Sequence, residues 1–354
     1  MAGLTGGRVL ITGASSGVGL VAAEAFLAEG AQVAVLARRA APVPGAIVLQ
    51  ADVTDRSGIE RAVASAVERL GGLDVLVANA GAAGYGHFLE VHPDDFEQVL
   101  AITLLGVANT VRAALPALRQ SRGTIVATGS LNSRVPLPGW SSYAAAKHGL
   151  RGFLNTLAVE EREQRSGVRV AMIHPGPVDT PLFAAASSAT GHTPRMPPDA
   201  YHPEVVARAL VAAAAEPRPE TMRGGETRLL DLTFAAARPV AETVLMLVDR
   251  WTRTGPEPAP QPGSLWEPPE EPGEPSGDIP ARDSMLGVLQ LGRRLLPAPA
   301  TPFRLVRHVA RFGSQVARNP LAVVRPAVEG PRPAHSLREG YPASTPSVRA
   351  VSER

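Results

Sequence analysis

The stretch that decides the fold lies near the start of the chain and reads "GRVLITGASSGVGLVAAEAFLAEG", from Gly7 to Gly30. Its first seven residues are a short apolar run that ends at glycine, which is typical of a buried β-strand. The segment from Val18 onward is expected to form a helix that Gly30 closes. The glycine-rich turn "TGASSGVG", Thr12 to Gly19, therefore joins the end of a strand to the start of a helix.

The alternation of strand and helix continues along the chain. Further strands are predicted at the apolar runs "AQVAVLAR", "AIVLQADV", "LDVLVANAG", "GTIVATGS" and "VRVAMIHPG". Helices are expected between them, over 57–70, around 96–119 and around Tyr143. Strands alternating with helices indicate βαβ units, and near-continuous apolar strands indicate a parallel sheet covered on both faces. We predict an α/β fold of the Rossmann type, a doubly wound parallel sheet in three layers, with ligands at the carboxyl ends of the strands.

The turn has features of a phosphate-binding loop. Gly13, Gly17 and Gly19 let the backbone turn tightly and approach a pyrophosphate, and the following helix offers its free N–H groups. The alternative is a glycine-rich turn that only packs. Its position between a first strand and a first helix favours dinucleotide binding.

The residues after the second strand bear on which dinucleotide is bound. An NAD site usually has an acidic residue at this strand end, whereas this chain has Ala37 followed by Arg38 and Arg39. A guanidinium can form paired, charge-assisted hydrogen bonds to a 2′-phosphate. NADP(H) is therefore favoured over NAD(H), with ordinary surface arginines as the alternative.

The stretch "GWSSYAAAKHGL" contains Tyr143 and Lys147, which share one face of a helix at spacing i, i+4. Lys147 is the sole lysine among 35 lysine and arginine residues. A nearby ammonium is expected to lower the pKa of Tyr143 and make it a general acid or base. Arginine would keep the charge but not the compact shape of an ammonium.

The loop "TGASSGVG" and the pair Tyr143 and Lys147 resemble the short-chain dehydrogenase/reductase superfamily, over about Gly7 to Ala215. The resemblance implies that Ser130 orients the substrate oxygen and that Lys147 also binds the nicotinamide ribose. It further implies cofactor contacts at the ends of other strands and in the loop after "VRVAMIHPG". The complete predicted cofactor set is Gly13, Ser15, Ser16, Gly17, Val18, Gly19, Arg38, Arg39, Asp52, Val53, Asn79, Ala80, Gly81, Tyr143, Lys147, Pro175, Gly176, Val178 and Thr180.

Thr103 departs from the family pattern. The resemblance implies an asparagine at this position, which bends its helix locally and binds a water in the proton relay. A threonine hydroxyl can bind a water but has no amide and a different reach. Thr103 therefore leaves two outcomes open, a relay with altered geometry or an impaired enzyme.

Composition limits the other functional classes. The 354 residues include no cysteine, so the chain has neither disulfides nor thiolate metal ligands, and no metal site is predicted. A net charge of +2 gives no general signature of nucleic-acid binding. The start of the chain lacks the pattern of a signal peptide, and we expect no transmembrane segment and a cytoplasmic location.

The C-terminal part of the chain changes in character. Of 34 prolines, 18 lie in residues 255–354. We divide the chain into a catalytic domain over 1–225, a helical segment over 226–254 and a proline- and arginine-rich extension over 255–354, partly disordered. Residues 303–318 form a predicted basic amphipathic helix, which either packs on the parent domain or contacts a membrane surface or partner.

The leading hypothesis is an NADP(H)-dependent oxidoreductase that interconverts a small-molecule carbonyl and alcohol by hydride transfer, as a homo-oligomer. Tyr143 would exchange the proton, Ser130 would orient the oxygen, and Lys147 would tune Tyr143. One alternative is a catalytically impaired dinucleotide-binding module whose tail recruits a partner or membrane. Another keeps the cofactor site for an epimerisation or a dehydration.

Overall fold

The computed structural model describes residues 4–195, 200–253, 263–268 and 273–277. The chain divides into two units, 1–295 and 296–354, and the second lies outside the described residues. The predicted basic helix over 303–318 therefore also lies outside them.

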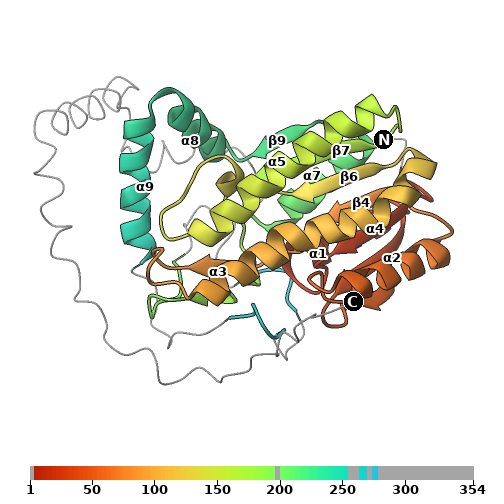
Figure 1. The fold of residues 1–354 in the computed structure, drawn as a ribbon, viewed down its shortest axis with the longest axis horizontal. Helices are drawn as coiled ribbons and strands as arrows, with labels where there is room; N and C mark the ends of the chain where they lie inside the picture. Colours follow the sequence, from red (N-terminus) through yellow and green to blue (C-terminus); the bar gives the residue numbers. More distant parts are fainter. Residues whose placement is uncertain (1–3, 196–199, 254–262, 269–272, 278–354) are drawn as a thin grey trace, which may run out of the picture. The chain divides into compact units, whose positions relative to one another are not determined.

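A seven-stranded parallel sheet forms the centre of the fold, in the order β3-β2-β1-β4-β6-β7-β9 (Figure 1). Its strands are β1 (Arg8–Thr12), β2 (Gln32–Ala37), β3 (Ile47–Gln50), β4 (Val75–Ala78), β6 (Thr124–Thr128), β7 (Arg169–Pro175) and β9 (Glu220–Arg223). A second, two-stranded sheet pairs β5 (Gly84–Tyr85) with β8 (Ser187–Ser188). The strand order reverses between β1 and β4, and the carboxyl ends there mark the expected place for a ligand.

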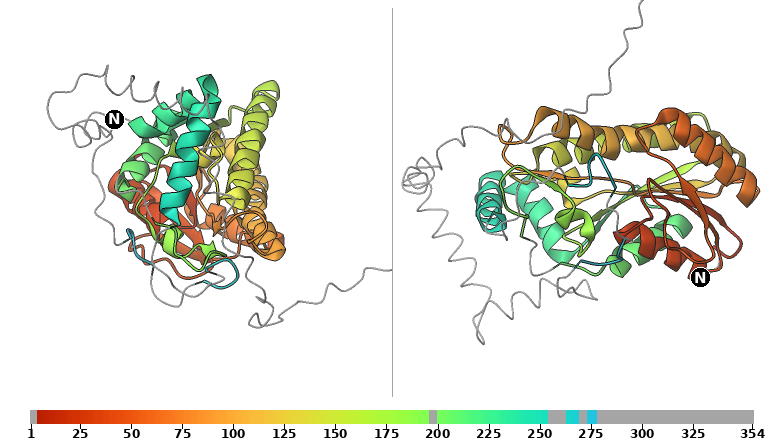
Figure 2. Two further views of the ribbon diagram at one scale, coloured as in Figure 1. Left: turned by 90° about the vertical axis from the view of Figure 1, so that its left-hand side faces the viewer. Right: turned by 90° about the horizontal axis from the view of Figure 1, so that it is seen from below.

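Helices cover both faces of the large sheet, and Figure 2 shows the two helical layers on either side of it. One layer contains α2 (Arg56–Leu70), α4 (Gly106–Ser121) and α5 (Ser141–Glu163), and the other contains α1 (Gly17–Ala28) and α7 (Pro203–Ala215). The remaining helical elements are α3 (Pro93–Leu100), η1 (Ala101–Leu105), η2 (Leu131–Ser133), α6 (Pro181–Ala184), α8 (Gly225–Ala236) and α9 (Arg238–Thr252). This arrangement is the three-layer Rossmann-type fold that the sequence predicts.

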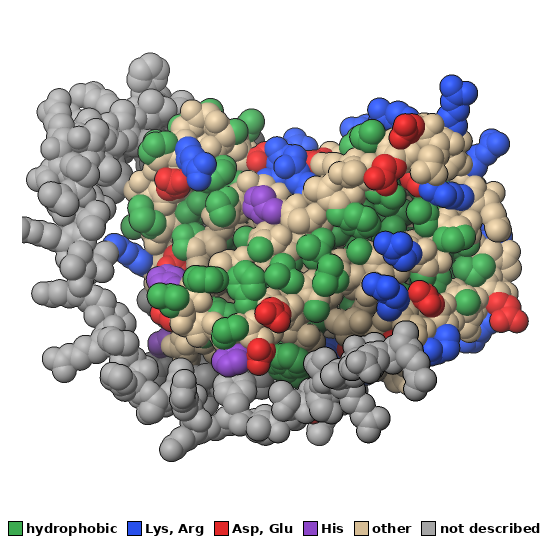
Figure 3. Space-filling view, in the orientation of Figure 1, with side chains coloured by type: hydrophobic (Ala, Val, Ile, Leu, Met, Phe, Trp, Pro, Cys, Tyr) green, Lys and Arg blue, Asp and Glu red, His purple; other side chains and the backbone are tan. Residues whose placement is uncertain are grey.

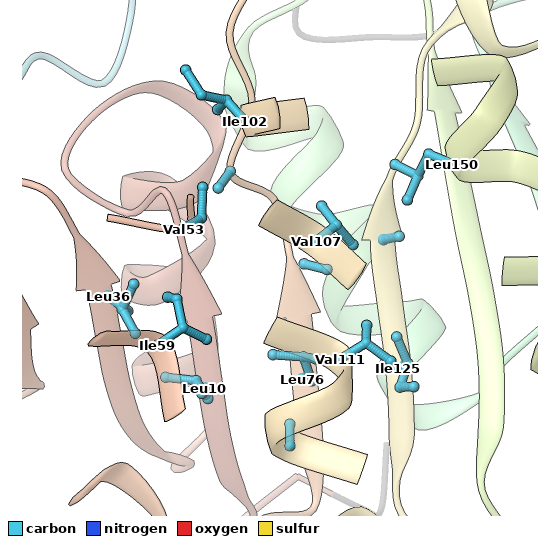
Figure 4. Packing of buried hydrophobic residues seen from close by; sticks show 14 of the residues in the cluster. Leu10, Leu36, Val53, Ile59, Leu76, Ile102, Val107, Val111, Ile125 and Leu150 are labelled. Carbon is cyan, nitrogen blue, oxygen red and sulfur yellow. The ribbon is translucent and has the colours of Figure 1, made fainter. Parts of the chain in front are cut away.

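Successive strand residues point to opposite faces of the sheet and feed two hydrophobic cores. Leu10 and Leu76 belong to the core beneath α2, α4 and α5, and Figure 4 shows them beside Ile59 and Val111 of those helices. The intervening Ile11 belongs to the core beneath α1 and α7. Because both faces are covered, the strands are apolar at nearly every position rather than at alternate ones.

The helix before β6 changes its winding in the middle. α3, the π-helical turn η1 and α4 run on as one helix over Pro93–Ser121. By length and composition this helix could cross a membrane, but 44% of its apolar window is buried inside the fold, and a core helix passes the same test. On the face that α4 and α5 cover, hydrophobic side chains gather over the middle (Figure 3), and Leu105 and Val159 are 57% and 62% exposed.

The end of the described chain adds one strand and two helices to the fold. The sequence did not predict the edge strand β9, whose residues "ETMR" include a single apolar side chain. The predicted helical segment over 226–254 forms two helices, α8 and α9. Pro239 is the second residue of α9, where a missing backbone N–H costs little.

Candidate active site

A cavity of about 320 Å³ opens at the carboxyl ends of the strands. Within the described part of the chain, its lining includes every predicted site residue except Gly19 and Thr103. These residues lie at or after the ends of six different strands, β1, β2, β3, β4, β6 and β7, or on α1 and α5. The fold therefore brings them together from segments that are far apart in the sequence.

The glycine-rich loop is shaped by close contacts to the residues that follow β4. Gly13 has a φ of +67°, and a Cβ there would lie 2.7 Å from the Cα of Ala80. Gly19 is buried beneath the loop, and its Cβ would lie 2.6 Å from Nδ2 of Asn79. That amide donates to the carbonyls of Thr12 and Gly13, at 3.2 and 3.3 Å. Gly19 thus allows the close packing that shapes the loop, without lining the cavity itself.

Asn79 connects three strand ends rather than only one. Its Oδ1 accepts a hydrogen bond from Oγ1 of Thr128 at 3.0 Å, while its Nδ2 bonds the end of β1. Thr12 completes the network, because its Oγ1 accepts from the backbone N–H groups of Asn79 and Ala80, both at 3.1 Å. The ends of β1, β4 and β6 are therefore fixed relative to one another below the cavity.

The residues after β2 and β3 line the other end of the cavity. Oδ1 of Asp52 accepts from the backbone N–H and the hydroxyl of Thr54, at 2.8 and 2.7 Å. Arg38 and Arg39 are both partly exposed. Burial, together with the charge of Arg38, lowers the pKa of Arg39. Two adjacent guanidinium groups make this end of the cavity attractive to an anion.

Ser130, Tyr143 and Lys147 line the cavity together. Ser130 follows β6 and caps η2, with its Oγ accepting from the backbone N–H of Asn132 at 3.1 Å. Tyr143 and Lys147 lie on the first turns of α5, and Nζ of Lys147 is 5.5 Å from the centroid of the Tyr143 ring. The same Nζ donates to the carbonyl of Thr128 at 2.7 Å, so the ammonium is fixed against the end of β6.

Burial has the largest effect on the pKa values of Tyr143 and Lys147. It raises the pKa of Tyr143 to about 12, although a hydrogen bond with Ser130 acts to lower it. Burial also lowers the pKa of Lys147 to about 8. The pKa of Tyr143 is therefore raised in this structure rather than lowered, because desolvation of the phenolate outweighs the hydrogen bond with Ser130.

Thr103 lies in the π-helical turn η1, is fully buried and does not line the cavity. Its Oγ1 accepts from the backbone N–H of Ala82 and donates to the carbonyl of Ala82, both at 3.0 Å. A Cβ on the neighbouring Gly81 would lie 3.7 Å from this Oγ1 and 3.8 Å from Nζ of Lys147. The local departure from α-helical winding that the resemblance attributes to an asparagine is therefore present here with a threonine.

The loop after β7 lies on the cavity wall through Pro175, Gly176, Val178 and Thr180. It is held from outside by Tyr201, whose carbonyl accepts from the backbone N–H of Asp179 at 2.9 Å. His174, near the end of β7, is fully buried, and its Nδ1 lies 3.3 Å from the carbonyl of Ser130.

The cavity also has walls that the sequence did not predict. Its apolar lining includes Leu131, Leu137, Trp140, Leu182, Phe183 and, from α9, Leu245 and Val248. Asp249 of α9 is 8% exposed and lies between the hydroxyl of Tyr85, at 3.4 Å, and Nε2 of His87, at 3.2 Å. Asp249, directly after the apolar run over 244–248 in α9, was the available signal for this wall.

Comparison with known proteins agrees with this geometry. A family profile described as short chain dehydrogenase matches residues 8–191. An uncharacterised NAD-dependent oxidoreductase of Mycobacterium tuberculosis is 40% identical over 149 residues, 41% of this chain and 54% of that protein. The uncharacterised oxidoreductase YxnA of Bacillus subtilis is 30% identical over 241 residues, 64% of this chain and 68% of YxnA.

Solved structures are similar in the same region. A short-chain dehydrogenase from Burkholderia cenocepacia, solved in complex with NADP, is 26% identical with a TM-score of 0.60. The alignment covers 69% of this chain and 98% of that one. The fold, with its cavity at the carboxyl ends of the strands, is of the Rossmann-type α/β class. The chain belongs to the short-chain dehydrogenase family, and it spans about half the length of the mycobacterial relative that it matches.

Proposed function

We propose that this protein is an NADP(H)-dependent oxidoreductase that interconverts a carbonyl and an alcohol. The observation that supports it most directly is that Ser130, Tyr143 and Lys147 line the same cavity as the glycine-rich loop. The convergence supplies a proton donor, an oxygen-binding hydroxyl and an ammonium next to a dinucleotide site.

The residues present fit a dinucleotide. A Cβ at Gly13 would collide with Ala80, so only glycine lets the loop before α1 keep the shape that a pyrophosphate requires. The backbone N–H groups of the first turn of α1 and the guanidinium groups at the β2 end are the donors for phosphate oxygens. When bound, the nicotinamide supplies the hydride for reduction or accepts it in oxidation.

In the reduction direction, Tyr143 donates its hydroxyl proton to the substrate oxygen, and Ser130 holds that oxygen in place. A phenol whose pKa is about 12 stays protonated at neutral pH and is therefore available as an acid. Lys147 brings a positive charge near the ring, which favours the phenolate that remains after the transfer. In oxidation the same groups act in the opposite order.

Arg38 and Arg39 support NADP(H) as the preferred form. Their charges lie at the end of β2, where Ala37 replaces the carboxylate that an NAD site would use. The mycobacterial relative is called NAD-dependent and the Burkholderia structure contains NADP, so relatives differ in this respect. The proposed NADP(H) preference of this chain rests on Arg38 and Arg39.

The other end of the cavity favours a substrate with an apolar body. Trp140, Phe183 and Leu245 lie on its wall, and an apolar group would displace water from them. We also propose that the protein is a homo-oligomer in the cytoplasm, which size-exclusion chromatography with light scattering and cell fractionation would test.

The proposed reaction is tested by NADPH oxidation with a panel of aldehydes and ketones that carry apolar groups. Tyr143→Phe removes only the acid and is expected to lower kcat by about 10²- to 10⁴-fold. Ser130→Ala is expected to lower it in the same direction through poorer orientation of the oxygen. The control is NADPH affinity and the unfolding temperature of each variant, which should stay close to wild type. Turnover that persists in Tyr143→Phe would remove Tyr143 from the mechanism.

A further inference from the structure

Two pieces of the C-terminal extension, residues 263–268 and 273–277, lie against the dinucleotide end of the cavity. We call these two pieces the strap, and they appear as thin blue segments in Figures 1 and 2. Ser264 and Pro268 line the cavity itself. The strap therefore lies where the proposed cofactor would bind.

The first piece of the strap bonds the guanidinium of Arg38 through main-chain oxygens. Nη1 of Arg38 donates to the carbonyls of Leu265 and Trp266, both at 3.2 Å, and Nη2 donates to the carbonyl of Ser264. Three consecutive carbonyls thus occupy donors of one arginine. These are the donors that a 2′-phosphate would require.

The second piece reaches the glycine-rich loop. The backbone N–H of Gly17, the first residue of α1, donates to the carbonyl of Glu274 at 2.8 Å. A Cβ at Gly273 would collide with the carbonyl of Ser15 and would lie 2.5 Å from Nη2 of Arg39. The strap thus brings acceptor oxygens to both of the places in the site that are suited to phosphate.

Specific contacts anchor the first piece to the body of the fold. Leu265 is fully buried in the core beneath α2, α4 and α5. Nε1 of Trp266 donates to Oδ1 of Asp95 at 3.0 Å, and Nε2 of Gln98 donates to the carbonyl of Leu265 at 3.2 Å. The backbone N–H of Ser264 donates to the carbonyl of Ala185 at 2.9 Å. The contact with Arg38 is therefore part of a docked segment.

We infer that the strap competes with the 2′-phosphate of the dinucleotide for Arg38. The docked strap thereby lowers the affinity of the enzyme for NADP(H) more than its affinity for NAD(H). The inference rests on the proposed NADP(H) function. A dinucleotide with a 2′-phosphate must displace residues 264–266 from Arg38, whereas one without it leaves these three contacts in place. A phosphate can displace carbonyls because a charged acceptor binds a guanidinium more strongly than a neutral one.

The test measures binding to the full-length protein without requiring turnover. The probes are 2′,5′-ADP and 5′-AMP, which differ by the 2′-phosphate, followed by NADPH and NADH. Leu265→Asp removes the buried anchor, and Trp266→Phe removes the bond to Asp95 as a milder variant. Glu267→Gln, at an exposed position of the same piece, is the matched control.

If the strap is docked in about nine of ten molecules, its release lowers the Kd for 2′,5′-ADP and NADPH by about tenfold. The Kd values for 5′-AMP and NADH are expected to change less, and Glu267→Gln should behave as wild type. Hydrogen exchange of residues 263–268 should increase when NADPH is added to the wild type and remain unchanged with NADH.

Two results would overturn the inference. Equal affinities in wild type and the two anchor variants would mean that the strap does not compete. Weaker 2′,5′-ADP binding in those variants, with slower exchange of the strap on adding NADPH, would mean that it closes over the ligand instead. Either result leaves the proposed function intact if Tyr143-dependent turnover is observed. By contrast, failure of every variant to bind 2′,5′-ADP and NADPH would remove the NADP(H) proposal itself, and the inference with it.

Discussion

The hydroxyl of Thr103 bonds both backbone groups of Ala82, accepting from its N–H and donating to its carbonyl at 3.0 Å in each case. One side chain in the π-helical turn thus holds the segment that follows residues 79–81. A hydroxyl can do this because it is both a donor and an acceptor, as an amide group also is. Thr103 therefore acts as a positioning residue for the wall of the cavity near Lys147.

The first prediction separates this role from packing. Thr103→Val keeps the shape of the side chain but leaves the two buried groups of Ala82 without their partner, so the free energy of unfolding should fall by about 1–3 kcal/mol. The value of kcat should also fall, since the segment beside Lys147 loses its support. Urea unfolding and steady-state kinetics measure the two effects. Thr103→Ser should restore both, and if it behaves like valine, the hydroxyl is not the reason.

The second prediction concerns Lys147 and pH. Burial lowers its pKa to about 8, so the ammonium loses its proton as the pH rises through that value. Because the pKa of Tyr143 is about 12, its hydroxyl stays protonated over the same range. The value of kcat/KM for carbonyl reduction should therefore decline above about pH 8. A constant or rising profile between pH 7 and 10 would show that the charge of Lys147 is not required.

The third prediction tests why the chain keeps a lysine here. The Lys147 side chain is 3% exposed and its Nζ bonds the carbonyl of Thr128, so the site fits a compact ammonium. Lys147→Arg retains the charge in a larger, planar group and is expected to lower kcat by about 10²-fold or more. Kinetics and an unfolding curve for the variant are the measurements. Activity close to wild type would mean that charge alone is sufficient.

Much of the fold follows from local sequence because its determinants are local. The strands of the sheet interior are apolar at nearly every residue, and the glycines from Gly13 to Gly19 lie between the first strand and the first helix. Those two patterns predict the parallel sheet, its two helical layers and the ligand-binding edge. The structure places Ser130, Tyr143 and Lys147 at that edge because each follows or faces the end of a buried strand.

The parts that sequence reasoning missed depend on contacts between distant segments. β9 has little apolar character, and its Glu220 is held by Arg134 and Arg151, at 2.6 and 2.7 Å. The strap has the composition of a linker, and it bonds Arg38 through carbonyls that every residue possesses. Leu265 and Trp266, two large apolar residues within a proline-rich segment, were the available signal that it docks.

The fourth prediction concerns stability at acidic pH. Burial lowers the pKa of His174 to about 4, although the nearby carboxylate of Glu220 acts to raise it. The unfolded chain, with a histidine pKa near 6.5, therefore binds more protons than the folded chain between these values, and stability falls as the pH decreases from about 6.5 toward 4. The effect is on the order of 3 kcal/mol when complete.

His174→Gln should remove this contribution to the slope, which urea unfolding at a series of pH values would measure. The slope due to His174 should be measured above about pH 4.5. Below that value Glu220 also changes the stability, because its pKa is lowered from 4.5 to about 2. The same substitution at the partly exposed His202 should leave the slope due to His174 in place. An unchanged slope in His174→Gln would assign the effect to other groups.

The fifth prediction uses one substitution at two glycines. A Cβ at Gly19 would lie 2.6 Å from Nδ2 of Asn79 and 2.8 Å from the backbone carbon of Gly13, so Gly19→Ala forces the loop away from β4. Overpacking of this kind costs about 1–3 kcal/mol of stability. It should also weaken NADPH binding, because the loop that receives the pyrophosphate is displaced.

At Gly152, on the exposed face of α5, a Cβ meets no atom within 4 Å. Gly152→Ala should instead stabilise the helix by about 0.5–1 kcal/mol and leave NADPH affinity unchanged. Calorimetry measures the stability of both variants, and titration measures their NADPH affinity. If Gly19→Ala and Gly152→Ala have the same effects, close packing beneath the loop is not the reason that position 19 requires a glycine.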